Sequence, residues 1–245
     1  MKTLSLAAAL VAIALLPLPA AAQAPADKTE APRKLIPRYP ADRDCPPVTS
    51  FFGSFDDVDG RKRDERHSGI DLGRLGDPVL APAPGVIVAV WRADWGWGPE
   101  GALMIRHSKA DLGLEYGPEF YYSEFDHLRY NEIADIRAGR RVARGETLAH
   151  VFRPGGDPDN LPEVHWEVWS IADDAATVWT RNEHHRRAWT NDTGHLVDPL
   201  YMLSLNGTIR ADGSVSIQAF DPARDYRKFR GFTYVLPCPP AHNGG

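Results

Sequence analysis

The stretch His67-Ser-Gly-Ile-Asp71-Leu-Gly73 is the segment from which the rest of this chain can be interpreted. His67 and Asp71 lie four positions apart across a glycine, so both side chains can turn toward one metal ion. An imidazole nitrogen and a carboxylate oxygen are ligands that suit zinc. Two ligands do not complete a zinc site, so the chain has to supply a third from elsewhere.

The best candidate for the third ligand is His165, in the segment Glu-Val-His-Trp-Glu-Val-Trp at residues 163–169. The alternation of side chains in this segment predicts a β-strand. Residues i and i+2 of a strand point to the same face, so we expect Glu163 and His165 to face one cleft together.

Three segments of the chain resemble the LytM/lysostaphin-type zinc endopeptidases, which cut peptide bonds in peptidoglycan. These segments are His67-x3-Asp71, Phe125-Asp-His127-Leu and Glu163-x-His165-Trp-Glu-Val. The resemblance implies that His67, Asp71 and His165 bind Zn²⁺. It also implies that His127 is a catalytic histidine that donates a hydrogen bond to the developing oxyanion. One departure is that Glu163 stands where the family has the first histidine of its HxH motif.

The departure at Glu163 leaves its role open between two alternatives. In the first, Glu163 is a catalytic general base, because a carboxylate beside a zinc site serves this purpose in the HExxH enzymes. In the second, Glu163 is a fourth ligand or fails to position water, and a closed four-ligand site is structural. We favour the first, since an inactive site would not be expected to keep the whole metal-binding set together with His127.

The fold that the resemblance implies is mainly β. We expect an antiparallel, LytM-like (duplicated-hybrid-motif-like) sheet with loop insertions, a C-terminal β extension and the metal in a groove above the sheet. The 21 glycines and 21 prolines also favour a β-rich fold with many turns. Residues 170–196 resemble an insertion that could rim the cleft. The expected strands include residues 86–90, 102–106, 120–128 and 163–169.

The function that the resemblance implies is that of an exported zinc metalloendopeptidase that hydrolyses peptide bonds in peptidoglycan crosslinks. A second hypothesis is a catalytically silent LytM-like domain that binds the cell wall or activates a separate hydrolase. A third is a zinc protease that acts on proteins, which would differ from the first only in the shape of its cleft. The net charge of −5 gives no reason to expect a nucleic-acid partner.

Residues 1–22 have the features of a signal peptide. Lys2 supplies a positive charge, residues 4–16 are apolar, and Ala20-Ala-Ala22 offers a small-residue cleavage site. The alternative is an uncleaved membrane anchor, but this apolar run is short for the ~20 residues that span a bilayer. We therefore expect a periplasmic or secreted protein without stable insertion into a membrane.

The mature chain is expected to have three parts. Residues 23–44 are a polar, Pro/Ala-rich tether expected to be disordered; residues 45–205 are the zinc peptidase domain; and residues 206–245 are a C-terminal extension. Cys45 and Cys238 bracket the last two parts, and disulfides persist in exported proteins. We predict a bridge between them, the alternatives being two free buried thiols or pairing with another chain.

The remaining histidines and the aromatic loop suggest no second site. The tryptophans of residues 91–101, including Trp95 and Trp97, could line a substrate groove, although packing on the sheet is favoured. Four further histidines are assigned structural or solvated roles rather than metal binding: His107, His150, His184 and His185.

Overall fold

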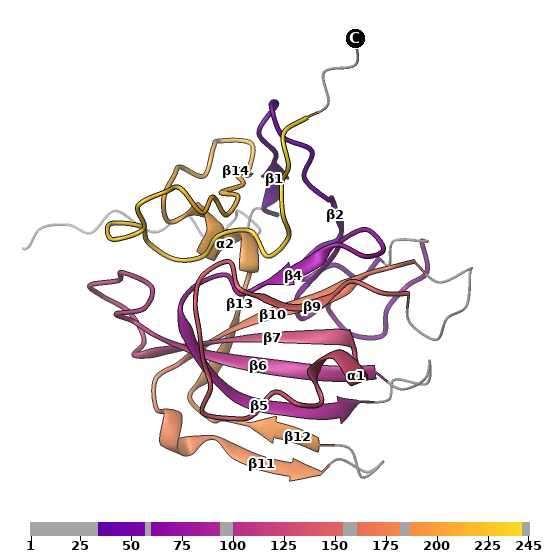
Figure 1. Cartoon of the computed structure of the whole chain (residues 1–245), viewed down its shortest axis with the longest axis vertical. Coiled ribbons are helices and arrows are strands. Elements are labelled where there is room, and N and C mark those ends of the chain that lie inside the picture. The colour runs from indigo at the N-terminus through magenta and orange to yellow at the C-terminus, as the bar shows by residue number, and fades with distance from the viewer. Residues whose placement is uncertain (1–33, 57–59, 94–99, 154–160, 182–186, 242–245) are drawn as a thin grey trace, which may run out of the picture. The chain divides into compact units, whose positions relative to one another are not determined.

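A central antiparallel β-sheet organises the fold (Figure 1). The computed structural model describes residues 34–56, 60–93, 100–153, 161–181 and 187–241, and in these residues eight strands form this sheet. The strand order is β2-β3-β10-β7-β6-β5-β8, and β13 also pairs with β10. The strands are β2 (Val48–Ser50), β3 (Ile70–Leu72), β5 (Gly85–Ala93), β6 (Glu100–Ser108), β7 (Phe120–Arg129), β8 (Arg141–Val142), β10 (Val164–Ile171) and β13 (Gly194–Val197).

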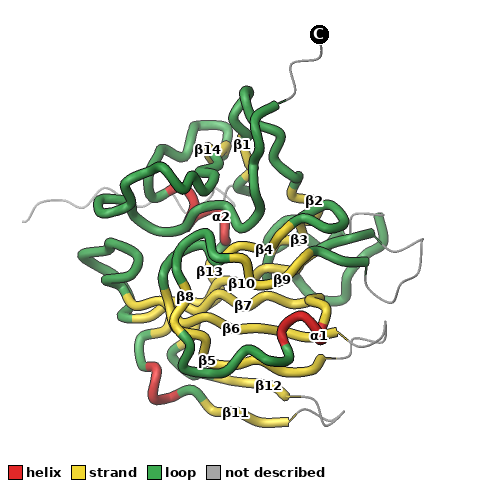
Figure 2. Tube along the Cα trace, viewed as in Figure 1, coloured by secondary structure: helices red, strands yellow, loops and turns green. Residues whose placement is uncertain are grey.

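Smaller elements surround the central sheet (Figure 2). Three pairs of strands lie outside it: β4 (Pro78–Leu80) with β9 (Thr147–His150), β11 (Val178–Arg181) with β12 (Arg187–Thr190), and β1 (Ile36–Arg38) with β14 (Ser214–Ser216). The helical segments are α1 (Tyr130–Ile133), the 3-10 turn η2 (Asp174–Ala176) and α2 (Pro199–Ser204). Loops and turns make up most of the remainder.

The prediction of a mainly β, antiparallel fold is confirmed, because every pairing within the central sheet is antiparallel. The expected strands at residues 86–90, 102–106 and 120–128 fall within β5, β6 and β7. The strand expected at residues 163–169 is β10, which begins one residue later, at Val164.

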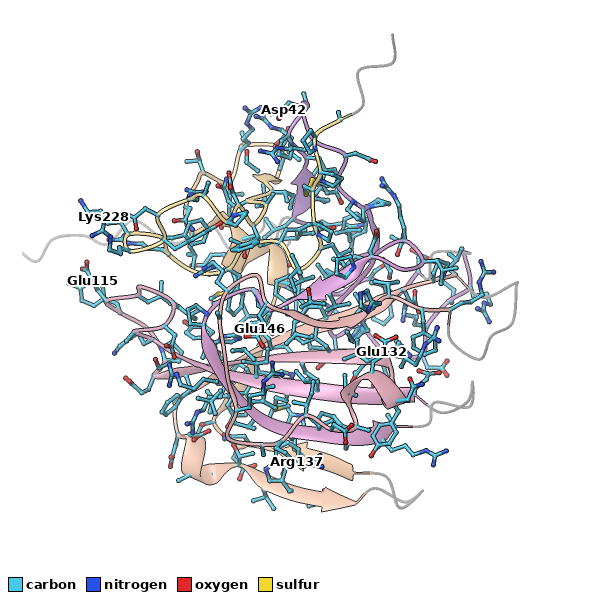
Figure 3. All side chains as sticks on the ribbon, in the orientation of Figure 1. Asp42, Glu115, Glu132, Arg137, Glu146 and Lys228 are labelled. Atoms are coloured by element: carbon cyan, nitrogen blue, oxygen red, sulfur yellow. A yellow bond between two sulfur atoms is a disulfide. The ribbon has the colours of Figure 1, made fainter. Side chains whose placement is uncertain are left out.

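The two faces of the sheet are covered by different hydrophobic clusters. Along β6, Leu103 and Ile105 belong to the main core, whereas Ala102 and Met104 belong to a second cluster. Successive residues of a strand point to opposite faces, so these two clusters lie on opposite faces. Charged side chains such as Glu115 point outward instead (Figure 3).

The second cluster is covered by the pair β11–β12, which lies within residues 170–196, the segment expected to be an insertion. Trp179 and Trp189 of this hairpin pack on the sheet together with Trp169 of β10. The indole nitrogen of Trp189 also donates a hydrogen bond of 2.8 Å to Oε2 of Glu124 in β7. Residues 170–196 therefore cover part of the face that carries Glu124.

The C-terminal extension packs onto the main core. It contributes one described strand, β14, and the buried side chains of Phe232, Tyr234 and Leu236. Cys238 forms a disulfide bond with Cys45, as the sequence predicts. This bond joins two cysteines that are 193 positions apart in the chain.

The end of the expected tether is part of the fold. Within residues 34–44, β1 pairs in parallel with β14, and Leu35 and Tyr39 pack against the core. These apolar side chains explain why the segment is ordered despite its polar neighbours. The predicted signal peptide lies outside the described residues. None of the helices in the described parts of the chain is long and apolar enough to cross a membrane.

Candidate metal centre

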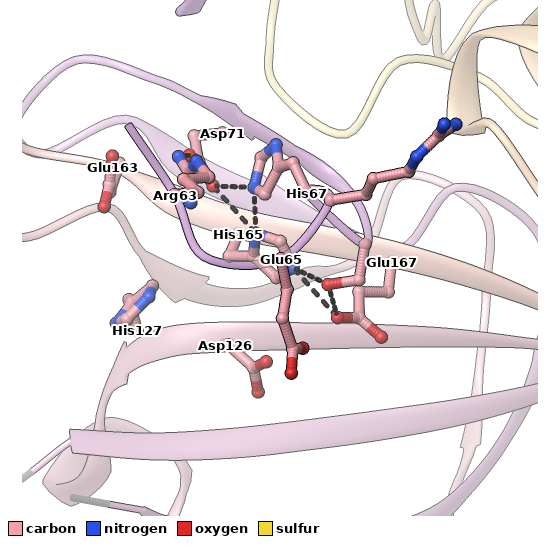
Figure 4. A pocket seen from close by; sticks show the side chains of 11 residues that line it. Arg63, Glu65, His67, Asp71, Asp126, His127, Glu163, His165 and Glu167 are labelled. Carbon is pink, nitrogen blue, oxygen red and sulfur yellow. Dashed lines mark hydrogen bonds and ion pairs between the residues drawn. The ribbon is translucent and has the colours of Figure 1, made fainter. Parts of the chain in front are cut away.

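Three side chains converge where β3 meets β10 (Figure 4). Asp71 in β3 is the register partner of His165 in β10, and His67 lies on the loop just before β3. Oδ1 of Asp71 is 2.7 Å from Nδ1 of His165 and 3.1 Å from Nε2 of His67. The two imidazole nitrogens are 3.0 Å apart. The sheet therefore brings together the three ligands that the sequence predicts, and all three are buried.

Gly69 allows the loop to approach β10 this closely. A β-carbon at this position would lie 2.3 Å from the backbone oxygen of Trp166. Any residue other than glycine would therefore clash with β10 unless the backbone moved. Glycine between His67 and Asp71 is thus a steric requirement of the site.

The hydrogen bonds around the two histidines hold one nitrogen of each ring and direct the other nitrogen toward the centre. Nδ1 of His67 lies 3.1 Å from the carbonyl oxygen of Phe51, which can only accept, so this nitrogen carries the proton and Nε2 has the lone pair. Nε2 of His165 lies 3.1 Å from Oε1 of Glu167 and its Nδ1 lies 2.7 Å from Oδ1 of Asp71, so both nitrogens face acceptors. A cation bound at the centre would replace the proton on Nδ1 and leave the proton on Nε2 with Glu167. Two imidazole nitrogens and a carboxylate oxygen fit a zinc ion with one further position open.

Glu167 orients the ring of His165 and is itself held in place. Its Oε1 also accepts a hydrogen bond from the hydroxyl of Ser68, and its Oε2 accepts one of 2.9 Å from the indole nitrogen of Trp169. Carboxylates that hold a metal-binding histidine in this way commonly tune the metal affinity. Sequence reasoning did not assign this role, although a glutamate two residues after His165 in a strand must share its face.

Arg63 holds the other oxygen of Asp71. Its Nη2 donates hydrogen bonds of 3.1 Å to Oδ2 of Asp71 and to the hydroxyl of Ser50. Oδ1 of Asp71 thereby remains directed at the two histidines. Arg63 lies in the charged stretch that precedes His67, where one arginine among several charges gives no signal in the sequence.

The electrostatics of the cluster favour a positive charge at its centre. Burial alone would raise the pKa of Asp71, but hydrogen bonds from His165 and His67 hold it well below its usual range. Burial alone would lower the pKa of His165, but hydrogen bonds with Asp71 and Glu167 raise it well above its usual value. The raised pKa of His165 favours its protonated form, and a cation that binds here would displace that proton.

The cluster lies in a pocket of about 330 Å³ that also contains Asp126, His127 and Glu163. Glu163 precedes β10 and forms a bridge with Phe152, and its carboxylate is not part of the group of three converging ligand atoms. His127 lines the same pocket near the end of β7 (Figure 4). The structure thus places both expected catalytic residues beside the expected ligands.

A β-bulge turns His127 into this pocket. The pairing of β6 with β7 shifts register between Gly101 and Leu103, so Asp126 and His127 both oppose Ala102. Consecutive residues of a regular strand face opposite sides, yet these two line the same pocket. His127 has a φ of 56°, a left-handed conformation that favours glycine.

Two further carboxylates lie near His127, those of Glu100 and Asp126, and the sequence does not predict them. Oε2 of Glu100, the first residue of β6, lies 2.6 Å from Nδ1 of His127. Oδ1 of Asp126 is buried and has no hydrogen-bond partner in the described residues. Burial raises the pKa of Asp126 to about 7.

The other histidines lie apart from this cluster where they are described. His107 is buried, with Nδ1 2.7 Å from the carbonyl oxygen of Pro84 and Nε2 3.1 Å from the hydroxyl of Ser123. His150 lies beside Glu132 at the surface. Both arrangements fit structural roles. The predictions for Trp95, Trp97, His184 and His185 lie outside the described residues.

Comparison with known proteins gives matches among solved structures. No family model matches the chain, and no curated protein matches it. A zinc-containing peptidase from Vibrio cholerae is 26% identical, with a TM-score of 0.36 over 56% of this chain and 37% of that chain. The chain resembles the lysostaphin-type peptidases. It spans little more than a third of the length of the Vibrio cholerae protein.

Two further matches have lower identity. The catalytic domain of the prophage-encoded M23 protein EnpA from Enterococcus faecalis is 21% identical, with a TM-score of 0.34 over 55% of this chain and 85% of that domain. Lysostaphin from Staphylococcus simulans is 17% identical, with a TM-score of 0.38 over 68% of this chain and 52% of that chain. All three TM-scores are below 0.5.

Proposed function

We propose that this chain is an exported zinc metalloendopeptidase that hydrolyses peptide bonds in peptidoglycan crosslinks. The observation that carries the proposal is the convergence of His67, Asp71 and His165 on one point in a pocket that also contains His127 and Glu163. Export is supported by the disulfide between Cys45 and Cys238, because such bonds persist in oxidising compartments.

The three predicted ligands share one task in this proposal. Nε2 of His67, Oδ1 of Asp71 and Nδ1 of His165 would hold the zinc ion. When bound, zinc supplies a Lewis acid that polarises the scissile carbonyl and makes water more acidic. The carboxylate of Asp71 offsets part of the positive charge, while the neutral imidazoles leave the site electrophilic.

Glu163 transfers the proton in this proposal, and His127 stabilises the developing negative charge. Glu163 accepts a proton from the attacking water and delivers it to the leaving amine, a contribution of roughly 10²–10⁴-fold for a general base. His127 donates a hydrogen bond to the developing oxyanion, for which a typical contribution is roughly 10²–10³-fold.

The test is digestion of purified peptidoglycan by the mature protein after its metal content has been measured. We expect one zinc per chain and soluble peptide-containing products. His165→Ala should lose both the metal and the products, whereas Glu163→Gln should keep the metal and lose the products. This pair separates metal binding from proton transfer.

Three other outcomes are informative. Activity that survives in Glu163→Gln would remove Glu163 from the role of base while leaving the enzyme. Zinc binding without products from any peptidoglycan would favour the silent binding or activating domain. A protein that binds no zinc would refute the site itself.

A further inference from the structure

Glu100 is a buried carboxylate whose described hydrogen-bond partner is His127. The Glu100 side chain is 1% exposed, and its Oε2 lies 2.6 Å from Nδ1 of His127. Its Oε1 is buried and has no hydrogen-bond partner among the residues that the structure describes. A buried carboxylate is costly unless a positive or donating group compensates it, and His127 is that group here.

The backbone is arranged to make this contact. The bulge in β7 and the left-handed φ of His127 turn its ring out of the regular alternation and toward the start of β6. Strained backbone of this kind persists where the surrounding structure enforces it, and it is concentrated at functional sites. Both the strain at His127 and the burial of Glu100 thus contribute to one hydrogen bond at the edge of the pocket.

The chemistry of this hydrogen bond fixes the state of the imidazole. An ionised carboxylate can only accept hydrogen bonds, so Nδ1 of His127 carries a proton. Nε2 is then the nitrogen that acts on a substrate. An imidazole donates through both nitrogens only in its charged form, so a His127 that donates from Nε2 has a positive ring.

We propose that Glu100 is the positioning residue of His127. Its carboxylate holds Nδ1–H, directs Nε2 toward the substrate, and offsets the positive charge of the ring when Nε2–H donates to the developing oxyanion. The arrangement has the logic of the aspartate that orients a catalytic histidine in serine proteases. This inference rests on the proposed function, in which His127 acts on the oxyanion.

Glu124 provides a matched control for a purely structural role. It is also a buried carboxylate, it lies on the next strand, and it accepts a hydrogen bond from Trp189. The described hydrogen bonds of Glu124 do not include His127. If the alteration of any buried carboxylate in this sheet lowered kcat, Glu124→Gln would therefore lower it as much as Glu100→Gln.

The first experiment compares Glu100→Gln, Glu100→Ala and Glu124→Gln in the zinc-loaded protein. We expect both Glu100 variants to keep one zinc per chain and to lower kcat by roughly ten- to hundredfold with little change in KM. Glu124→Gln should retain the wild-type kcat. Wild-type kcat in both Glu100 variants, or an equal loss in Glu124→Gln, would overturn the proposal.

The second experiment does not depend on catalytic activity. Nitrogen-15 NMR of histidine-labelled protein distinguishes protonated from unprotonated ring nitrogens, and the signals of His127 can be assigned from their loss in His127→Gln. We expect Nδ1 of His127 to be protonated in the wild type and to lose this preference in Glu100→Ala. A neutral His127 with its proton on Nε2 would overturn the proposal.

The two experiments separate this inference from the proposed function. If no peptide is cleaved, the proposed function fails, while the NMR spectra still report whether Glu100 determines the state of His127. If peptide is cleaved and Glu100 has no influence on either measurement, the inference fails and the proposed function stands.

Discussion

Oδ1 of Asp71 lies 2.7 Å from Nδ1 of His165, although 94 positions separate the two residues in the chain. The antiparallel register of β3 and β10 places them directly opposite each other. A shift of one residue in this pairing would move the side chains of one strand to the other face and separate the two groups. The register of the sheet therefore sets the geometry of the candidate metal centre. The residues that hydrogen-bond to each imidazole set the orientation of that ring.

Removal of Glu167 should weaken metal binding without abolishing it. Glu167 accepts the hydrogen bond from Nε2 of His165, and loss of such a partner typically lowers metal affinity by roughly 10–100-fold. We expect Glu167→Ala to raise the Kd for zinc by this factor in a competition titration with a chelator. Trp169→Phe removes one hydrogen bond to Glu167 but keeps the carboxylate, and it should have the smaller effect. Equal affinity of Glu167→Ala and wild type would contradict the orienting role.

The backbone at His127 predicts an unusual order of stability for two truncations. His127→Ala and His127→Gly both remove the imidazole, but only alanine keeps a β-carbon in the left-handed conformation. We expect His127→Gly to be the more stable of the two by about 1 kcal/mol in denaturant unfolding. In a regular strand alanine would be the more stable, so that order would refute the strain at this position.

The buried His107 should make the protein less stable in acid. Burial lowers the pKa of His107 to about 4, below its ordinary value, so between these values the unfolded chain binds more protons than the folded one. The contribution of neutral His107 is complete above the ordinary pKa and is lost as the pH falls toward 4. We expect the free energy of unfolding to drop between pH 7 and 4.5 by on the order of 2 kcal/mol more in the wild type than in His107→Gln. Identical pH dependence in the two proteins would show that His107 is not responsible.

The disulfide between Cys45 and Cys238 should contribute strongly to stability. It closes a loop with a sequence separation of 193, and the chain-entropy model gives about 5 kcal/mol for a loop of this length. We expect the double substitution C45S/C238S to lower the free energy of unfolding by this order of magnitude. Reductant should destabilise the wild type and leave the double variant unchanged. A wild type that is insensitive to complete reduction would contradict this expectation.

Short-range sequence patterns were sufficient to predict several strands of the central sheet and the three converging residues. His67 and Asp71 form a local motif, and the alternation around His165 indicates a strand whose face is set by position alone. The antiparallel β class followed from the family resemblance and is confirmed by the strand pairings. The assignment of these residues as zinc ligands, and of His127 and Glu163 as catalytic residues, stays a prediction until the site is tested.

The contacts that depend on register could not be predicted. Glu100 is 27 positions before His127 and follows a glycine- and tryptophan-rich stretch that has no periodic pattern. Its contact with His127 requires both the pairing of β6 with β7 and the bulge within it. Arg63 reaches Asp71 from an irregular segment, where no period relates a residue to a face.

The link between Cys45 and Cys238 also constrains the order of events during biogenesis. Domains fold as the chain emerges, N-terminal part first, but Cys45 has to wait for a partner that follows the entire sheet. Oxidation to the native pairing is therefore a late event that occurs after the segments of the metal centre have all been delivered. A mispaired or reduced Cys45 would mark chains that stopped short of Cys238.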